Sequence, residues 1–375
     1  AFCREGSVAP LTAAKRLVVQ SLVKTESTDP RIEYARFPML HLLSNLPRYA
    51  LAGLLARHFV WAARFTVLTA RCPALALVGR DLAYHALAQA LNQYRVIENV
   101  VITNSNYSKQ FLWMTDLPDR RWQLHMVWYS MNNNIFVYRE DPVAGVFPSF
   151  RHIRADHHWV WTAGQAAFLR GLDIPGTMHP VGPILWYLPG TGAAPVFGAL
   201  RVAVFDVTPV NREFERDYGL AYNYYASANM IAFIRDVVDA ALAVGATHER
   251  PVRLLLKHKR SHSPIHDREY IRVVEELSVG SGLIDLVPPE TNIFDLLAGC
   301  DAAVVIPYSS PAYVAAHMGV HVIYYDPAEI LEPRFEPAAA LCFVAGKERL
   351  VEKLINMAKD MAGVKSHRRS VLGVR

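Results

Sequence analysis

Short apolar runs alternate with amphipathic segments through the second half of the chain. The runs are too short for buried helices and rich in valine, leucine and isoleucine, which favours strands. They span 200–205, 252–257, 283–287, 302–306, 320–325 and 341–345. Helical patterns stand between and after them, at 222–244, 267–277, 293–300, 311–317 and 349–361. Successive strand and helix units of this kind predict a parallel, doubly wound sheet.

The first half of the chain shows a weaker form of the same pattern. Its periodicity predicts helices at 11–23, 37–46, 49–70 and 81–94, so we expect a helical N-terminal segment. Strands are predicted at 99–103, 123–129, 159–162 and 181–187, with a helix at 163–172. The stretch 188–198 is rich in proline and glycine, as linkers are. We therefore expect an α/β protein of two Rossmann-like domains, at 1–190 and 199–375.

Composition narrows the class of partner. The chain has 375 residues, 52% of them hydrophobic, a net charge of +5 and a pI of about 9.0, which suits an anionic partner such as a nucleotide-sugar or a lipid headgroup. Nucleic acid is disfavoured because the basic residues are scattered and no nucleic-acid-binding signature occurs. The four cysteines lie far apart, which fits a reducing cytoplasm and argues against a structural zinc or disulfides.

The first residues of the chain, its basic tail and one predicted helix indicate where in the cell the protein is expected to lie. The first residues lack an apolar core, so no signal peptide is expected, and the missing initiator Met indicates a processed chain or part of a longer protein. Arg57 and Arg64 interrupt the apolar stretch 49–70, which favours a core or interfacial helix over a spanning one. We expect it to rest on an anionic membrane surface. The basic tail 365–369 is expected either to assist or to be a disordered linker to a further domain.

Polar residues follow the strands predicted in the second domain. In a doubly wound sheet, ligands bind outside the carboxyl ends of the strands, so these residues are the candidate site. They are Asp206, Lys257, His258, Lys259, Arg260, Glu290, Tyr308, Ser309 and Ser310.

Each of these candidates has more than one interpretation. Ser309 and Ser310 precede a helix, where they are suited to bind a phosphate or to cap the helix. The basic run 257–260 is either a phosphate site or a solvated loop. Asp206 is a candidate nucleophile or general base, or else forms a turn. Glu290 is placed to accept from ribose hydroxyls, while Thr291 or Asn292 is a candidate cap of the next helix.

The first domain offers Asp156, His157 and His158. We expect general acid–base work or acceptor contacts from them, or plain surface histidines, rather than a metal site. No Asp-x-Asp pair occurs, so a divalent metal with a nucleotide-sugar is not expected. The lack of GxGxxG after the first strands, of a P-loop and of GxSxG disfavours NAD-dependent redox chemistry, phosphoryl transfer and serine hydrolysis.

The stretches Phe205-Asp-Val-Thr-Pro209, Lys257-His258 and Pro307-Tyr-Ser-Ser310 resemble bacterial GT-B glycosyltransferases that use CMP-activated Kdo (a 3-deoxy-octulosonic acid). Trp128-Tyr-Ser-Met-Asn132 and 159–164 add to the similarity, which covers the chain from about residue 97. His258 departs from the His-Pro pair of related CMP-sugar transferases, since Lys259 follows it. The resemblance implies two domains facing a central crevice, and a nucleotide bound by the second.

It further implies a retaining reaction through an Asp206 adduct, with CMP as the leaving group and no metal or other cofactor. Lys257, Lys259 or Arg260 would neutralise the phosphate or the Kdo carboxylate, and Asp156, His157 or His158 would deprotonate the acceptor. The expected acceptor is a lipid-linked surface glycan, and the expected location is the cytoplasmic face of the inner membrane. Two alternatives stay open: a GT-B transferase using a UDP- or GDP-sugar, and a non-catalytic module of a polysaccharide assembly complex.

Overall fold

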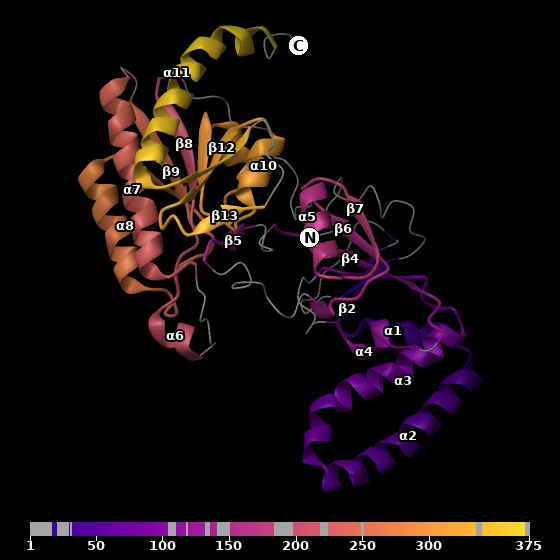
Figure 1. The fold of residues 1–375 in the computed structure, drawn as a ribbon. Coiled ribbons are helices and arrows are strands. Elements are labelled where there is room, and N and C mark those ends of the chain that lie inside the picture. Colours follow the sequence, from indigo (N-terminus) through magenta and orange to yellow (C-terminus); the bar gives the residue numbers. More distant parts are fainter. Residues whose placement is uncertain are drawn as a thin grey trace. The chain divides into compact units, whose positions relative to one another are not determined.

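The computed structural model describes residues 17–20, 30, 32–103, 110–117, 119–131, 136–140, 151–183, 198–217, 224–248, 251–334 and 340–371 (Figure 1). The chain forms two compact units. Unit 1 comprises 1–129, 148–160 and 169–188, and unit 2 comprises 130–147, 161–168 and 189–375. The main change of unit thus falls close to residue 189, and two earlier segments belong to unit 2 as well.

Unit 2 is built on a six-stranded parallel sheet of order β10-β9-β8-β11-β12-β14. The strands are β8 (Leu200–Phe205), β9 (Val252–Lys257), β10 (Ile284–Val287), β11 (Ala302–Val305), β12 (His321–Asp326) and β14 (Leu341–Ala345). Every residue of β11 is buried, as expected for a central strand covered on both faces. The predicted strands of this half are confirmed.

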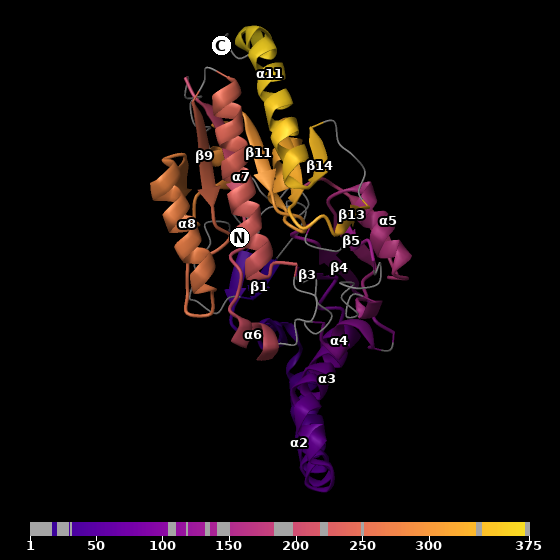
Figure 2. The same ribbon diagram turned by 60° about the vertical axis from the view of Figure 1, so that its left-hand side comes forward.

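Helices cover both faces of that sheet. They are α7 (Ser227–Thr247), α8 (Arg268–Ser281), α9 (Ile293–Ala298), α10 (Pro311–His317) and α11 (Lys347–Val371). The short helix α6 (Arg212–Asp217) has no buried residue and lies beyond the end of the sheet. Figure 1 shows α7 and α8 on one side of the sheet and α10 on the other, and Figure 2 shows α11 beside α7. The sheet is therefore doubly wound, and the predicted α/β class with parallel sheets is confirmed.

A segment from the first half of the chain adds to unit 2. Strand β5 (Phe136–Tyr138) pairs antiparallel with β13 (Leu331–Pro333), which follows β12. Phe136 is buried, and its ring packs at 5.0 Å from that of Tyr324. This pairing explains why 130–147 belongs to unit 2 although it lies far from it in the sequence.

Unit 1 contains a four-stranded parallel sheet in the order β3-β4-β6-β7. Its strands are β3 (Asn99–Ile102), β4 (Gln123–Val127), β6 (His157–Val160) and β7 (Thr177–Pro180). In β6 burial alternates, so His158 points into the core and His157 away from it. The prediction placed β6 too late, at 159–162. The strand predicted at 181–187 begins after β7 has ended, and its residues 184–187 lie outside the described residues. β6 begins with two histidines and β7 with a threonine, and these polar residues hide the apolar signal.

Unit 1 also holds most of the N-terminal helices. They are α1 (Pro38–Leu42), η1 (Leu43–Asn45), α2 (Arg48–Arg71), η2 (Pro73–Val78), α3 (Gly79–Gln93) and α4 (Leu112–Thr115), with α5 (Ala163–Gly171) divided between the units. The helix predicted at 11–23 is wrong for its described part. Residues 17–20 form β1, which pairs in parallel with β2 (Ile32–Ala35). The run Leu17-Val-Val-Gln20 holds two β-branched residues, which suit a strand.

Candidate functional site

The strand order of unit 2 creates a switch point between β8 and β11. These two strands are neighbours, but the chain continues from β8 to β9 on one side and from β11 to β12 on the other. The connections leave in opposite directions, so the carboxyl ends of β8 and β11 are where such a sheet binds ligands. Asp206 follows β8 directly, and residues 306–310 follow β11.

Asp206 lies at this point in a buried cluster of three side chains. It is 2% exposed, and its Oδ2 accepts hydrogen bonds from Nδ1 of His258, at 2.7 Å, and from the hydroxyl of Tyr270. His258 follows the neighbouring strand β9, and Tyr270 belongs to α8. Oδ1 of Asp206 and Nε2 of His258 have no partner among the described residues. The cluster therefore holds one carboxylate oxygen and leaves the other, which is also buried, without a partner among the described residues.

The contacts define which atoms carry protons. An ionised carboxylate only accepts, so Nδ1 of His258 must be the donor in this hydrogen bond. Burial raises the pKa of the Tyr270 hydroxyl well above its usual value, and the nearby Asp206 charge raises it further. Tyr270 is therefore a permanent donor to Asp206 at any physiological pH.

The basic residues after β9 are less concentrated than the sequence indicates. Lys257 donates to the carbonyl of Pro289, and burial lowers its pKa, an effect partly offset by Asp206 and Glu290. Lys259 and Glu290 are exposed to solvent. Of the two candidate caps of the next helix, Asn292 is the one that caps it: its Oδ1 accepts the N–H of Phe294 at the start of α9.

The stretch after β11 contacts two described residues of the 130–147 segment, Met131 and Phe136. Tyr308 has a left-handed backbone, with φ of 60°, and its hydroxyl donates to the carbonyl of Phe136 at 3.1 Å. Ser310 stands at the N-cap of α10 but does not cap it, since its Oγ accepts the N–H of Met131 at 2.8 Å. Ser309 is buried beside them. A strained φ on an aromatic residue persists only where surrounding contacts over-determine it, as they do here.

Sequence reasoning missed Asp326. It ends β12 at the same edge of the sheet and is fully buried. Its Oδ1 accepts the hydroxyl of Tyr224 at 2.8 Å, and its Oδ2 accepts the N–H of Leu331. The signal that selected Asp206, a carboxylate at the end of a buried strand, was also present at Asp326.

A cavity of about 310 Å³ opens nearby, with Arg139, Phe343 and Arg349 in its lining.

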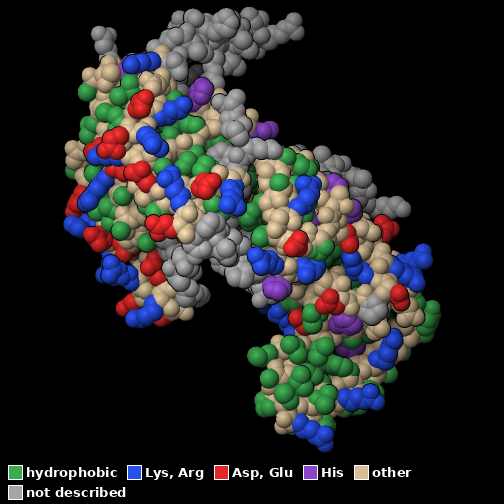
Figure 3. Space-filling view, in the orientation of Figure 1, with side chains coloured by type: hydrophobic (Ala, Val, Ile, Leu, Met, Phe, Trp, Pro, Cys, Tyr) green, Lys and Arg blue, Asp and Glu red, His purple; other side chains and the backbone are tan. Residues whose placement is uncertain are grey.

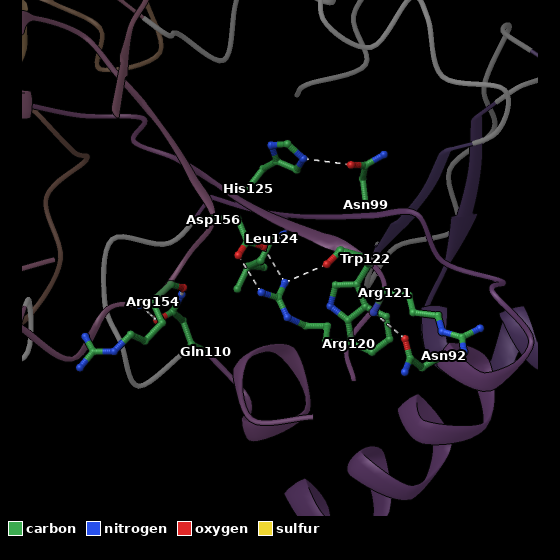
Figure 4. Close-up of polar contacts among 10 residues, drawn as sticks. All are labelled: Asn92, Asn99, Gln110, Arg120, Arg121, Trp122, Leu124, His125, Arg154 and Asp156. Atoms are coloured by element: carbon green, nitrogen blue, oxygen red, sulfur yellow. Dashed lines mark hydrogen bonds and ion pairs between the residues drawn. The ribbon is translucent and has the colours of Figure 1, made fainter. Parts of the chain in front are cut away.

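In unit 1 the predicted base Asp156 is held by an arginine. Figure 4 shows Arg120 reaching both carboxylate oxygens, at 2.6 and 2.7 Å, while the N–H of Leu124 donates to Oδ2. The hydrogen bond from Arg120 lowers the pKa of Asp156, which makes it a weaker base. This geometry is that of an ion pair that fixes the β4–β6 pairing.

The two adjacent histidines of β6 differ in surroundings. His158 is fully buried, with Nδ1 accepting from Trp128 and Nε2 donating to the carbonyl of Pro175, and burial lowers its pKa. Both of its nitrogens are thus engaged. His157 is partly exposed and lies against His179, with 3.1 Å between ring nitrogens. Across the described ranges, no group of three or more His, Cys, Asp or Glu side chains is arranged to hold a metal ion.

Comparison with known proteins identifies the family. The sequence profile described as "Polysaccharide biosynthesis PFTS motif protein" matches residues 57–354, which is most of the chain. The chain belongs to this PFTS family. The matched range includes Asp206 and residues 306–310, which lie at the switch point.

Other comparisons give only distant likenesses. No curated protein matches the chain. Among solved structures, TarM of S. aureus has a TM-score of 0.41 at 10% sequence identity, and the match covers 73% of this chain. The GtfA/B complex has a TM-score of 0.42 at 11% identity, and the match covers 76% of this chain. A glycosyltransferase from Rickettsia africae has 0.40 at 11% over 73%. The chain spans 52%, 54% and 70% of those three structures respectively, and such weak likenesses carry no argument about its activity.

Proposed function

We propose that this PFTS-family protein is a GT-B glycosyltransferase that moves Kdo from CMP-Kdo to a lipid-linked surface glycan. Membership of a polysaccharide biosynthesis family supports the general role. The observation that carries the proposal is the state of Asp206 at the switch point, with Oδ2 held by two donors and Oδ1 without a partner. The donor, the acceptor and the retaining outcome rest on the sequence resemblance.

In the first step, Oδ1 of Asp206 attacks the anomeric carbon of Kdo. The bond between that carbon and the CMP phosphate oxygen breaks, and its electron pair leaves with CMP, so that Kdo becomes an ester of Asp206. Nδ1 of His258 and the Tyr270 hydroxyl hold Oδ2 throughout, which fixes the direction of attack. In the second step the acceptor oxygen displaces Asp206, and its proton passes to a general base.

The leaving CMP and the Kdo carboxylate both carry negative charge, which this chain's own cations would balance. Lys257 ends β9, where it pairs with Phe205 next to Asp206, Lys259 follows β9, and Ser309 follows β11. A second proton on His258 would turn Nε2 into a donor for a phosphate oxygen. These groups suit a single phosphate without a divalent metal. A donor made in the cytoplasm would place the reaction there, at the inner membrane.

The test is a thermal-shift panel of CMP, CDP, UMP, UDP, GDP and ADP on the full chain, followed by CMP-Kdo turnover. A ligand that binds only the folded state raises the melting temperature. We expect CMP alone to do so, and the shift to be smaller in Lys257→Ala and Ser309→Ala. Arg349→Ala, in the cavity beside β14, is the matched control and should keep the wild-type shift.

Intact-mass measurement with CMP-Kdo and no acceptor then addresses the adduct. We expect one Kdo added to wild type and none to Asp206→Asn. A shift with UDP or GDP in place of CMP would reject the Kdo assignment, and no shift with any nucleotide would favour a non-catalytic module. CMP binding and turnover without an adduct would reject the Asp206 ester while keeping the donor.

A further inference from the structure

Helix α2 exposes an apolar face of unusual extent. Leu55 is 70% exposed and Phe59 79%, and Leu77 in η2, at the far end of the same hairpin, is 88% exposed. Tyr49, Val60, Val67 and Leu68 are exposed on the same helix. Figure 1 shows α2 and α3 projecting from the unit 1 sheet as a hairpin, and Figure 3 shows hydrophobic side chains gathered over it. We call these exposed residues of α2 and η2 the α2 face.

Helical geometry places the apolar and basic positions in separate stripes. At 100° per residue, Leu55, Phe59, Ala63 and Val67 follow one another along one side of the helix. Arg57, Arg64 and Arg71 recur every seven residues, so they form a second stripe, centred about 120° around the helix from the first. The opposite side packs inward through Ala50 and Leu54, and Nε2 of His58 reaches the carbonyl of Ala83 in α3.

The charge around this face has one sign. Between residues 48 and 80 the sequence has five arginines and no aspartate or glutamate, and Asp81 is the first acidic residue after them. The five are Arg48, Arg57, Arg64, Arg71 and Arg80. Exposed apolar side chains together with unopposed arginines are complementary to a surface that offers hydrocarbon beneath anionic headgroups.

We propose that the α2 face is the membrane-docking surface of this protein, lying in the headgroup region of an anionic bilayer with Leu55, Phe59 and Leu77 in the acyl boundary. The helix is long and apolar enough to cross a bilayer, with 6% of its best window buried inside the protein. The arginine stripe runs through its middle, however, where a spanning helix would have to bury charge. An interfacial position leaves that stripe at the headgroups and buries the apolar one.

Vesicle flotation of the full chain tests the docking surface, with phosphatidylcholine vesicles and with vesicles containing 30% phosphatidylglycerol. We expect binding to the anionic vesicles and much weaker binding to the neutral ones. Each arginine near the membrane surface raises the partition coefficient onto anionic vesicles by about fivefold. The triple variant Arg57→Gln/Arg64→Gln/Arg71→Gln should therefore bind these vesicles roughly a hundredfold more weakly. Leu55→Ser/Phe59→Ser should lose binding to both kinds of vesicle, because the apolar contact is lost.

Matched controls come from exposed residues of unit 2. Val279 is 87% exposed, and Val279→Ser should bind as wild type does. Arg216→Gln/Arg268→Gln/Arg272→Gln removes the same charge from exposed positions of α6 and α8, and should change binding far less than the α2 triple variant. If both triple variants lost vesicle binding equally, the net charge of the protein would explain the binding, and the proposal would be overturned.

Two further outcomes would also overturn it. If wild type is a dimer without vesicles and Leu55→Ser/Phe59→Ser is a monomer, the α2 face binds a second copy. If bound protein resists extraction by alkaline carbonate, α2 spans the bilayer. The CMP panel separates this proposal from the enzymatic one, since the α2 variants should keep their nucleotide response whatever they do to vesicle binding.

Discussion

Nδ1 of His258 lies 2.7 Å from Oδ2 of Asp206, across the carboxyl ends of the neighbouring strands β8 and β9. Both side chains are buried, and Tyr270 supplies a second donor to the same oxygen. A buried carboxylate is costly unless donors surround it, so the two donors stabilise the charge that the proposed chemistry needs. The same contacts set the orientation of Oδ1.

Asp206→Asn should abolish transfer while leaving the fold intact. Asparagine keeps the shape and an accepting oxygen for His258 and Tyr270 but is no nucleophile, so we expect turnover to fall on the order of a thousandfold or more. CMP release measures turnover, and circular dichroism checks the fold. Asp285→Asn, which removes a half-exposed partner of Arg253, is the control and should retain activity. Turnover in Asp206→Asn near that of wild type would contradict the assigned role.

Tyr270→Phe should destabilise the protein more than Tyr308→Phe does. Both lose a single buried hydroxyl, but Tyr270 donates to a carboxylate and Tyr308 to a neutral carbonyl. Hydrogen bonds to charged groups contribute about 1.5–3 kcal/mol and neutral ones about 1 kcal/mol. Urea unfolding of both variants gives the comparison. Equal losses in free energy of unfolding would show that Asp206 does not depend on Tyr270.

Asp156→Asn should weaken the fold at neutral pH and leave the chemistry unchanged. Arg120 lowers the folded-state pKa of Asp156, so the carboxylate stabilises the protein above its unfolded pKa of about 3.9 and loses that contribution as the pH falls through the folded pKa. We expect a loss of about 2 kcal/mol at pH 7 that shrinks below pH 4. Urea unfolding at several pH values measures it. A large fall in turnover per folded molecule would instead restore Asp156 as the base.

The buried His158 should make the protein less stable as pH falls from 7 to 5. Burial lowers its folded pKa, so the unfolded chain binds a proton below about pH 6.5 that the folded chain does not. His158→Gln should be less stable at pH 7 and show a flatter pH dependence of the free energy of unfolding. His125→Gln is the comparison: burial lowers the pKa of His125 too, but this side chain is only partly buried, so its replacement should flatten the slope less. An unchanged slope in His158→Gln would assign the pH dependence to other groups.

Some of this protein follows from its sequence because the causes are local. The strands of unit 2 are short apolar runs that only a buried sheet accommodates, and their order along the chain with intervening helices predicts parallel pairing. The helix at 311–317 begins at Pro311, where a missing N–H has no cost. Asp206 was selected because a carboxylate directly after a buried strand must lie at the edge where ligands bind.

The tertiary structure decided what each of these side chains does, because their partners are far away in the sequence. Asp206 meets Tyr270 across 64 residues, and Ser310 meets Met131 across 179. No periodicity reveals that Arg120 neutralises Asp156, or that His158 points inward while His157 does not. A pattern of apolar and polar residues records which positions must be buried. Which buried polar groups then satisfy one another depends on packing between elements, and only the folded chain sets it.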